Sequence, residues 1–282
     1  MTRVRWALNQ LLGLRLGAFG LLMCLLIVTG SALAPVLAPF DSLESNFGDS
    51  LQPPSSTHYF GTDELGRDIF SEILWGGRTT LLVVVLSVTI SITIGLVIGS
   101  LSGYLGGTAD TVAARGIDAF LVIPSAILAI VVAAVLGPSL INIVLALSIV
   151  FWPVTARIVR GEYLALKNLP FVKAAEMAGL GRLKIVFFEM LPAVSPLVIV
   201  NAAFLAGEAI LAEAGLSFLG LQDPDVSSWG KMVFDSKDVL RYAWWTAVFP
   251  GMAIVILVFG TNLLGDAIND RLRPSREELL VG

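Results

Sequence analysis

The chain has 282 residues, of which 56% are hydrophobic and 14% are charged, and its mean hydropathy is +0.85. Soluble domains are typically about 45–50% apolar and about 25% charged, so this composition excludes an ordinary water-soluble globular domain. The 18 Lys and Arg residues against 22 Asp and Glu give a net charge of -4 without a basic block, which disfavours nucleic-acid binding. The single cysteine, Cys24, lies in an apolar run, so the chain has no internal disulfide and no cysteine-based metal or redox motif.

Six apolar runs are each long enough to cross a bilayer, since a spanning helix needs roughly 20 residues. They lie at 17–38, 79–103, 119–137, 139–157, 193–214 and 242–265. Hydrocarbon offers backbone groups no hydrogen-bond partner, and the runs are too long and continuous for the alternating strands of a barrel. The predicted fold is therefore an all-α polytopic membrane protein with six transmembrane helices.

The first run combines features of a signal peptide and of a membrane anchor. It follows the basic residues Arg3, Arg5 and Arg15, and its end at residues 31–34 resembles a signal-peptide cleavage site. Because its apolar stretch is longer than the usual core of a signal peptide, we expect a retained anchor, with cleavage as the alternative. Cleavage would leave the other spans oriented as they are.

Lys and Arg residues are distributed unequally between the segments that join the spans. If the N-terminus is cytoplasmic, 13 of the 18 fall in the inner segments 1–16, 104–118, 158–192 and 266–282, with Arg157 counted at the boundary, and five fall outside. This positive-inside pattern predicts a multi-pass membrane protein with cytoplasmic N- and C-termini.

The predicted organisation has three parts. Residues 1–78 hold the first span and an extracytoplasmic loop, in which 39–62 is extended and 63–75 forms a short amphipathic helix that ends at Gly76-Gly77. Residues 79–265 form the main membrane domain, with a long inner loop at 158–192, and residues 266–282 form a cytoplasmic tail.

Several spans contain small residues at regular spacing and prolines. Gly95, Gly99 and Gly103 recur at four-residue spacing on the second span, which predicts a face for close helix packing, as a static contact rather than a moving joint. Pro124, Pro153 and Pro196 fall inside or at the edges of spans, where each removes a helical hydrogen bond and favours a kink.

One ionisable side chain, Glu208, lies deep in a span, and Glu213 lies near the outer end of the same span. A carboxylate at the bilayer centre costs on the order of 2.5–3.5 kcal/mol on insertion scales, so we expect Glu208 to face protein or a water-filled cavity. A proton relay would need further ionisable partners at that depth, and the sequence offers none. A structural or pathway-lining role is therefore favoured over proton coupling.

Residues 157–192 form an inner segment much longer than a turn requires. Within it, 162–167 has a helical pattern, Pro170 starts another helix, Gly179 suits the left-handed conformation that ends a helix, and Gly181 allows the chain to turn back. The helix resumes over 182–190. A short alanine-faced helix thus projects between two arms, suited either to a partner's groove or to a lipid surface.

Part of this segment resembles the Glu-Ala-Ala motif of ABC importer permeases. Lys173-Ala174-Ala175, Gly179 and the Leu-Pro pair at 191–192 have its spacing, with Lys173 in place of the family's usual Glu. The resemblance implies that the helix couples the membrane domain to an ATPase. The coupling residues that it implies are Phe171, Lys173, Ala174, Ala175, Glu176, Gly179 and Gly181.

Further stretches narrow the resemblance to the dipeptide, oligopeptide and nickel permeases. Residues 60–68 resemble their outer-loop signature, residues 216–221 with 228–232 are similar to their second outer loop, and 152–161 also fits. The match extends over about 60–268 and looks like the C-type member of the two permease subunits. The outer-loop motif residues are Gly61, Thr62, Asp63, Gly66, Arg67 and Asp68.

The resemblance implies the fold of type I ABC importer permeases and a heterodimer with a homologous permease subunit. It also implies two ATP-binding subunits or domains, an extracytoplasmic solute-binding protein, and ATP and Mg used by those partners. The residues agree, because Gly230-Lys231 is the sole Gly-Lys pair and Asp225 stands where a phosphate-binding loop requires Gly. We expect no enzymatic activity, cofactor or metal in this chain, and a solvated His58 in the polar outer loop.

The expected function is that of a permease subunit which, with its homologous partner, forms the pathway for di- or oligopeptides. One alternative is import of nickel or another small solute through the same architecture. A second is an ion-coupled secondary transporter, which predicts ionisable networks and inverted halves. A third, an intramembrane enzyme, needs a nucleophile and a base at membrane depth. The pathway or gate candidates are Glu208, Glu213, Ser217, Phe218 and Trp229.

Overall fold

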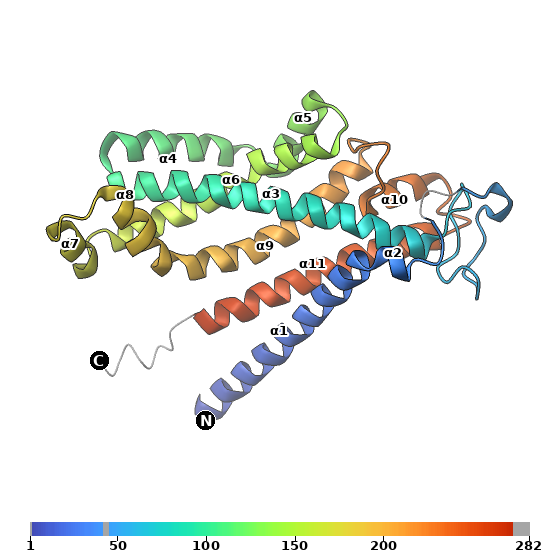
Figure 1. The fold of residues 1–282 in the computed structure, drawn as a ribbon, viewed down its shortest axis with the longest axis horizontal. Coiled ribbons are helices and arrows are strands. Elements are labelled where there is room, and N and C mark those ends of the chain that lie inside the picture. Colours follow the sequence, from blue (N-terminus) through green and yellow to red (C-terminus); the bar gives the residue numbers. More distant parts are fainter. Residues whose placement is uncertain (1, 42–44, 273–282) are drawn as a thin grey trace.

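The computed structural model describes residues 2–41 and 45–272 of the chain. Its helices run mainly along one long axis (Figure 1). They are α1 (Thr2–Ala32), α2 (Ala34–Leu37), α3 (Ile69–Leu105), α4 (Gly107–Val122), α5 (Ser125–Leu136), α6 (Leu140–Leu166), α7 (Pro170–Met177), α8 (Arg182–Lys184), α9 (Leu191–Phe218), α10 (Trp229–Asp235) and α11 (Trp245–Leu272). A π-helical turn, Ile185–Met190, joins α8 to α9.

Five helices in the described residues are long and apolar enough to cross a membrane, or six if the bent pair α4 and α5 is one span. The prediction of an all-α polytopic membrane protein is confirmed. The short helix α7 lies at one end of the bundle, and α10 lies at the opposite end beside the loop that precedes α3 (Figure 1). We call these the α7 end and the α10 end.

The most extensive helix contact among the described residues joins α3 to α6 through the predicted glycine face. A Cβ atom on Gly95 would lie 2.6 Å from Cβ of Thr155, and one on Gly103 would lie 2.7 Å from Cβ of Tyr163. A Cβ on Gly99, between them, would lie 2.6 Å from the carbonyl oxygen of Ala156 in the α6 backbone. Side chains larger than hydrogen would force the helices apart, as expected for small residues at membrane helix interfaces. The residue numbers of the contacting pairs increase together along α3 and α6, so the two helices run parallel.

The structure differs from the prediction at the third span, 119–137. α4 and α5 meet at an angle of 89°. α4 ends at Val122, and Ile123 is extended (φ -83°, ψ 127°), because Pro124 has no N–H and disfavours a helical conformation in the residue before it. Hydropathy does not reveal this bend, because the residues on both sides of it are apolar.

α4 also begins at Gly107, within the segment predicted as an inner loop. Two ion pairs attach it to α6: Arg160 Nη2 lies 3.0 Å from Asp110 Oδ2, and Arg157 Nη2 lies 2.8 Å from Asp118 Oδ1. From the first pair to the second, the residue number rises on α4 and falls on α6, so the two helices are antiparallel. The pair α4 and α5 thereby returns the chain to the α10 end, which allows the parallel contact of α3 and α6.

The amphipathic helix predicted over 63–75, with its end at Gly76-Gly77, is wrong. α3 begins at Ile69 and continues through both glycines to Leu105. A Cβ on Gly77 would lie 2.8 Å from Cζ2 of Trp229, so this glycine permits close packing instead of ending a helix.

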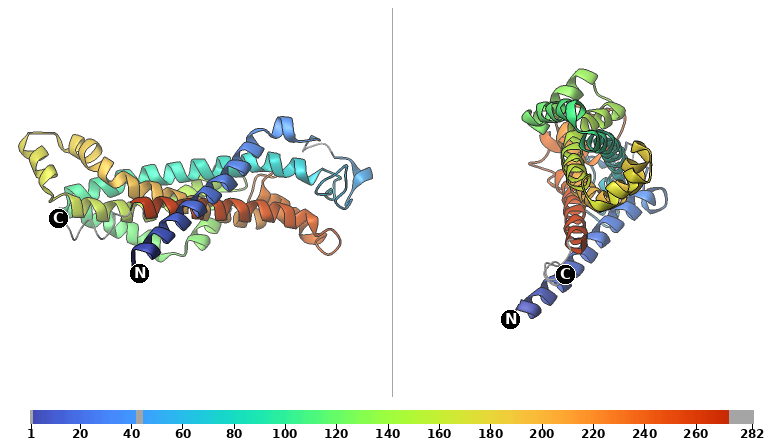
Figure 2. Two further views of the ribbon diagram at one scale, coloured as in Figure 1. Left: turned by 90° about the horizontal axis from the view of Figure 1, so that it is seen from below. Right: turned by 90° about the vertical axis from the view of Figure 1, so that its left-hand side faces the viewer.

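α1 packs along α11 at the edge of the bundle, and Figure 2 shows it projecting away from the other helices. A Cβ on Gly20 would lie 2.8 Å from the carbonyl oxygen of Gly260, so the two helices cross closely there. Side chains elsewhere on α1, such as Leu22 and Leu26, are exposed, as suits a helix that faces lipid on most sides. Of the predicted tail 266–282, α11 includes the residues up to Leu272, and 273–282 lie outside the described residues.

Candidate functional site

The helix predicted for coupling is a separate helix at the α7 end. Pro170 is its first residue, a position where the missing N–H would have no intrahelical partner. Val172 is its buried residue and packs with Val159, Tyr163 and Ile185. One side chain thus anchors α7 to the arms formed by α6 and the π-helical turn.

The other faces of α7 are open to a partner. Ala175 is partly buried. The remaining predicted coupling residues are exposed: Phe171, Lys173, Ala174, Glu176, Gly179 and Gly181. An exposed helix that projects in this way is free to dock into a groove of another subunit.

Glu176 links α7 to the end of α3. Its Oε2 accepts a hydrogen bond from Lys173 Nζ at 3.1 Å, and its Oε1 accepts one from the hydroxyl of Tyr104 at 3.1 Å. These bonds, that of Lys173 first, hold the pKa of Glu176 below its usual range. Lys173, where the related motif has Glu, therefore forms an ion pair within α7.

The end of α7 follows the prediction for Gly179 but not for Gly181. Gly179 has φ +78°, and the N–H groups of Gly179 and Leu180 donate to the carbonyl oxygens of Glu176 (3.0 Å) and Ala175 (3.2 Å). This is the Schellman pattern, which favours glycine at the left-handed position. Gly181 has φ -64° and ψ 146°, a conformation open to any residue, so the turn does not depend on its being glycine.

The two arms beside α7 are tied to each other. Tyr163 on α6 is buried, and its hydroxyl donates a hydrogen bond of 2.8 Å to the carbonyl oxygen of Val186. That carbonyl lies in the π-helical turn, where the shift from i→i+4 to i→i+5 bonding disturbs the regular ladder. The bond therefore joins α6 to the turn that leads into α9.

At the α10 end, residues of the outer-loop motif form hydrogen bonds with one another. Oδ1 of Asp63 accepts hydrogen bonds from the N–H groups of Leu65 (2.9 Å) and Arg67 (2.7 Å), and its Oδ2 accepts one from Arg67 Nε at 2.7 Å. The hydroxyl of Thr62 accepts a bond from the N–H of Gln52 at 2.8 Å. The motif is therefore an ordered turn.

Two glycines of the motif occupy positions closed to other residues. Gly61 and Gly66 have φ of +78° and +74°. A Cβ on Gly61 would lie 2.6 Å from the carbonyl oxygen of Gln52, and one on Gly66 would lie 1.8 Å from that of Asn46. Both the conformation and the packing thus require glycine.

Asp68 ends the motif and begins α3. Its Oδ2 accepts hydrogen bonds from the N–H and the hydroxyl of Ser71, at 2.8 and 2.7 Å, as an N-cap does. Its Oδ1 lies 3.0 Å from Nδ1 of His58, which is buried and stacks on Phe40. The expectation of a solvated His58 is therefore wrong, because the loop folds back and the carboxylate of Asp68, ten positions further along the chain, supplies the partner that burial demands.

The motif also joins the first turns of two long helices. Arg67 Nη1 lies 3.1 Å from Glu72 Oε1 in α3, and Trp245 Nε1 at the start of α11 donates to the carbonyl oxygen of Thr62 at 3.1 Å. Burial acts to lower the pKa of Arg67, but the charges of Glu72 and Asp63 outweigh it and raise that pKa.

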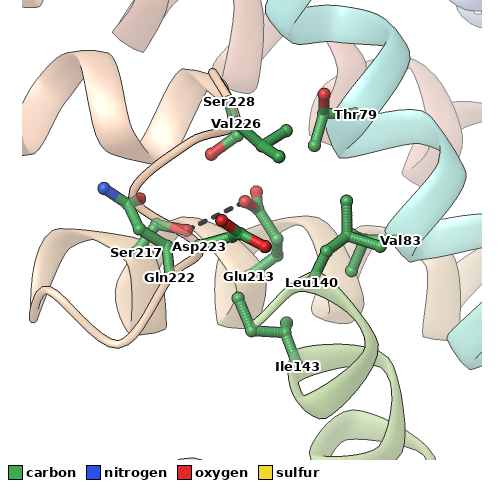
Figure 3. Close-up of a pocket in the computed structure, with 10 residues that line it drawn as sticks. All are labelled: Thr79, Val83, Leu140, Ile143, Glu213, Ser217, Gln222, Asp223, Val226 and Ser228. Carbon is green, nitrogen blue, oxygen red and sulfur yellow. Dashed lines mark hydrogen bonds between the residues drawn. The ribbon is translucent and has the colours of Figure 1, made fainter. Parts of the chain in front are cut away.

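Three of the predicted gate residues lie in one buried network (Figure 3 shows part of it). Glu213 is 1% exposed. Its Oε1 accepts a hydrogen bond from the hydroxyl of Ser217 at 2.9 Å, and its Oε2 accepts one from Thr80 at 3.5 Å. The hydroxyl of Ser228 is a further hydrogen-bond partner. Buried Trp229 donates from Nε1 to the carbonyl oxygen of Ile73 at 2.9 Å. The network ties α9 and the start of α10 to α3.

The two other gate candidates lie outside this network. Phe218 is 49% exposed, and Glu208 is exposed on α9 and forms no ion pair within the described residues. Within this chain, the buried carboxylate of the span is therefore that of Glu213.

The sequence does not single out several residues that make contacts at the α7 end and the α10 end. Tyr104, Tyr163 and Thr80 lie near the ends of spans, where polar residues are common, so their type and position gave no signal. The available signal was at Ser228, since a Ser before a helical segment is a preferred N-cap, and its Oγ does accept from the N–H of Lys231 at 3.4 Å.

The membrane bundle, the exposed helix between two tied arms and the ordered loop at the opposite end define the membrane component of a transporter. Residues 95–278 match the family of binding-protein-dependent transport system inner membrane components, and the chain belongs to that family. The resemblance recognised from the motifs is confirmed.

Relatives and a solved structure agree with this assignment. The chain is 39% identical over 272 residues to the dipeptide transport system permease protein DppC of Alkalihalophilus pseudofirmus, covering 96% of this chain and 89% of that protein. It is 36% identical over 261 residues to the oligopeptide transport system permease protein OppC of Bacillus subtilis, covering 92% and 86%. An inward-facing structure of the MetNI methionine ABC transporter has a TM-score of 0.57, with 72% of this chain and 97% of that chain covered. At 21% identity, this last likeness shows a shared fold.

Proposed function

We propose that the chain is one permease subunit of an ATP-driven ABC importer that takes up di- or oligopeptides. The observation that carries the proposal is α7, which is anchored through Val172 and exposes the remaining coupling residues. Relatives named as dipeptide and oligopeptide permeases, at 39% and 36% identity, support the class of cargo. Nickel or another small solute is the alternative cargo for the same architecture.

The working importer requires partners. A homologous permease subunit completes the pathway, two ATP-binding subunits or domains dock at the α7 end, and an extracytoplasmic solute-binding protein delivers the peptide at the α10 end. ATP and Mg act in the ATP-binding partners, and this chain binds no cofactor. The excess of basic residues in 1–16, 104–118, 158–192 and 266–282 supports cytoplasmic termini and a cytoplasmic α7 end in the cell (inner) membrane.

The proposed mechanism is mechanical. ATP closes the partner ATPases and displaces α7, and the bond between Tyr163 and Val186 passes that movement to α6 and α9 together. α9 carries Glu213, whose hydrogen bonds reach α3 and α10, so the movement arrives at the opposite end of the bundle. The ATP-bound ATPases must prefer one membrane state over the other, because equal affinity would shift nothing.

The pathway lies against the exposed face of α9 around Glu208. A carboxylate that faced lipid at this depth would cost on the order of 2.5–3.5 kcal/mol. Contact with the partner permease or with a water-filled pathway removes most of that cost. Glu208 acts there as a polar lining residue and not as a proton carrier.

Reconstitution tests the function. The chain, its homologous partner and the ATP-binding subunits are placed in lipid vesicles, and uptake of labelled dipeptide is measured with and without ATP and binding protein. We expect uptake that needs all components. Accumulation of peptide by vesicles that hold this chain alone would overturn the proposal. ATP-dependent uptake of nickel but not of peptide would show that the cargo is nickel.

A further inference from the structure

One side of α9 is left uncovered by the described residues. Its exposed residues recur at intervals of three and four positions, which places them along one side of a helix. They are Glu208, Leu211, Gly215 and Phe218. A Cβ added to Gly215 would meet no described atom within 4 Å, whereas Glu213, on the opposite side of α9, is 1% exposed. This side of the helix is therefore available to a partner, to a solute or to lipid.

Glu208 is the ionisable residue on that side, and the described residues give it no cationic partner. It lies ten residues before Phe218, the last residue of α9, and α9 contains no Lys or Arg. Glu208 forms no ion pair within the described residues. A lone carboxylate at this depth is unfavourable against lipid, so a protein surface or a water-filled space must face it.

The surroundings of this carboxylate differ from open water. Its neighbours on the same side of α9, Leu211 and Phe218, are apolar and are 55% and 49% exposed. Apolar walls screen a charge less than water does, so a pathway bordered by them attracts cations to the carboxylate and repels anions. Channels select cations with rings of Asp and Glu side chains on the same principle.

We propose that Glu208 makes the pathway favour peptides with Lys or Arg side chains over peptides with Asp or Glu side chains. This inference rests on the proposed function, in which the pathway passes this side of α9. The negative charge attracts a cationic side chain of the cargo and repels an anionic one. The open space at Gly215, two turns further along the same side, leaves room for that side chain to pass.

Two other factors act on cargo selection and have to be separated from Glu208. The solute-binding protein makes its own selection, and the preference at Glu208 is added to it. A basic residue of the homologous permease subunit could instead pair with Glu208. Such a pair would cancel the charge and remove the preference, so the experiment below distinguishes the two partners.

The experiment compares two cargos in the complete transporter reconstituted in lipid vesicles. The solute-binding protein is saturated with Ala-Lys or with Ala-Glu at pH 7, where both side chains are fully charged. The measured quantity is the number of peptides taken up per ATP hydrolysed, which separates passage of the cargo from the rate of the ATP cycle. The ratio of the Ala-Lys value to the Ala-Glu value is the charge preference.

Three variants assign the preference to Glu208. Glu208→Gln should lower the charge preference by about tenfold, the lower end of the effect of a cleft lined by one sign of charge, and Glu208→Lys should lower it further. The matched control is Glu189→Gln, because Glu189 is an exposed acid in the π-helical turn before α9, and it should keep the preference of the unmodified chain. Each preference compares two cargos in one preparation, so a loss of folded transporter changes both values alike.

Thiol labelling tests separately whether position 208 faces water. Glu208→Cys is made together with Cys24→Ala, which removes the native thiol, and is treated with a positively charged methanethiosulfonate reagent. We expect labelling, because a thiol in contact with water ionises and reacts. Leu26→Cys, on an exposed face of α1, is the control and should not be labelled because its thiol faces lipid.

The outcomes separate this inference from the proposed function. ATP-dependent uptake with the same charge preference in the unmodified chain, Glu208→Gln and Glu208→Lys would overturn the role of Glu208 and leave the proposed function intact. Failure of Glu208→Cys to react, both with and without ATP, would also overturn that role. Absence of uptake of any peptide by the complete transporter would instead overturn the proposed function.

Discussion

The hydroxyl of Tyr163 donates a hydrogen bond of 2.8 Å to the carbonyl oxygen of Val186, across the two arms that carry α7. Tyr163 is fully buried, and it packs in the same cluster as Val172, the anchor of α7. The anchor of α7 and the bond between its arms thus form one unit. In the proposed mechanism, this unit would allow a helix of eight residues to move two long helices.

Tyr163→Phe should weaken this transmission with little change in packing. The substitution removes one hydroxyl and leaves the carbonyl oxygen of Val186 without its donor, at a cost of about 1–3 kcal/mol. We expect ATP hydrolysis that responds less to peptide-loaded binding protein, measured as the ratio of stimulated to basal activity. Tyr242→Phe is the control, because Tyr242 is 74% exposed at the opposite end. Equal ratios in the two variants would contradict the role of Tyr163.

Gly179→Ala should impair coupling where Gly181→Ala does not. At Gly179 a Cβ would meet no described atom within 4 Å, so the penalty is conformational, about 1–2 kcal/mol for a left-handed residue. Gly181 is equally open but has a negative φ. Co-purification of the ATP-binding subunits and peptide-stimulated ATP hydrolysis give the measurement. The end of α7 would be irrelevant to coupling if both variants matched the unmodified chain.

Gly99→Ala should destabilise the bundle. The new Cβ would lie 2.6 Å from the carbonyl oxygen of Ala156, and a backbone atom cannot turn aside as a flexible side chain can. Overpacking of this kind costs about 1–3 kcal/mol. Gly116→Ala on α4 is the control, since no described atom lies within 4 Å of that site. Thermal unfolding in the same detergent compares the two, and an unchanged midpoint for Gly99→Ala would refute the close contact.

Glu208→Gln should leave the pH dependence of uptake unchanged. The variant keeps the size and polarity of the exposed side chain and removes its charge, so a lining role tolerates it whereas a proton relay does not. Initial uptake rates between about pH 5.5 and 8 give the measurement. A flat profile in the variant beside a pH-dependent profile in the unmodified chain would establish proton involvement and overturn the structural role.

The helical class, the approximate spans and the ends of α7 could be predicted because each depends on neighbouring residues. A span requires enough consecutive apolar residues, Pro170 favours a first helical position, and Gly179 favours the left-handed conformation after a helix. The glycine face of α3 was also visible, since its spacing is local. The bend at Pro124 was expected only as a kink, because the direction of a bend depends on what the two halves pack against.

The amino-acid sequence by itself determined that this chain is a helical membrane component with a separate short helix between Pro170 and Gly179, because length, apolarity and turn residues act over a few positions. The tertiary structure alone decided which carboxylates are buried and what surrounds them. Glu213 meets Thr80 across 133 positions of the chain, and His58 meets Asp68 only because the outer loop folds back. Such contacts depend on how segments distant in the sequence pack together, and no local pattern specifies that packing.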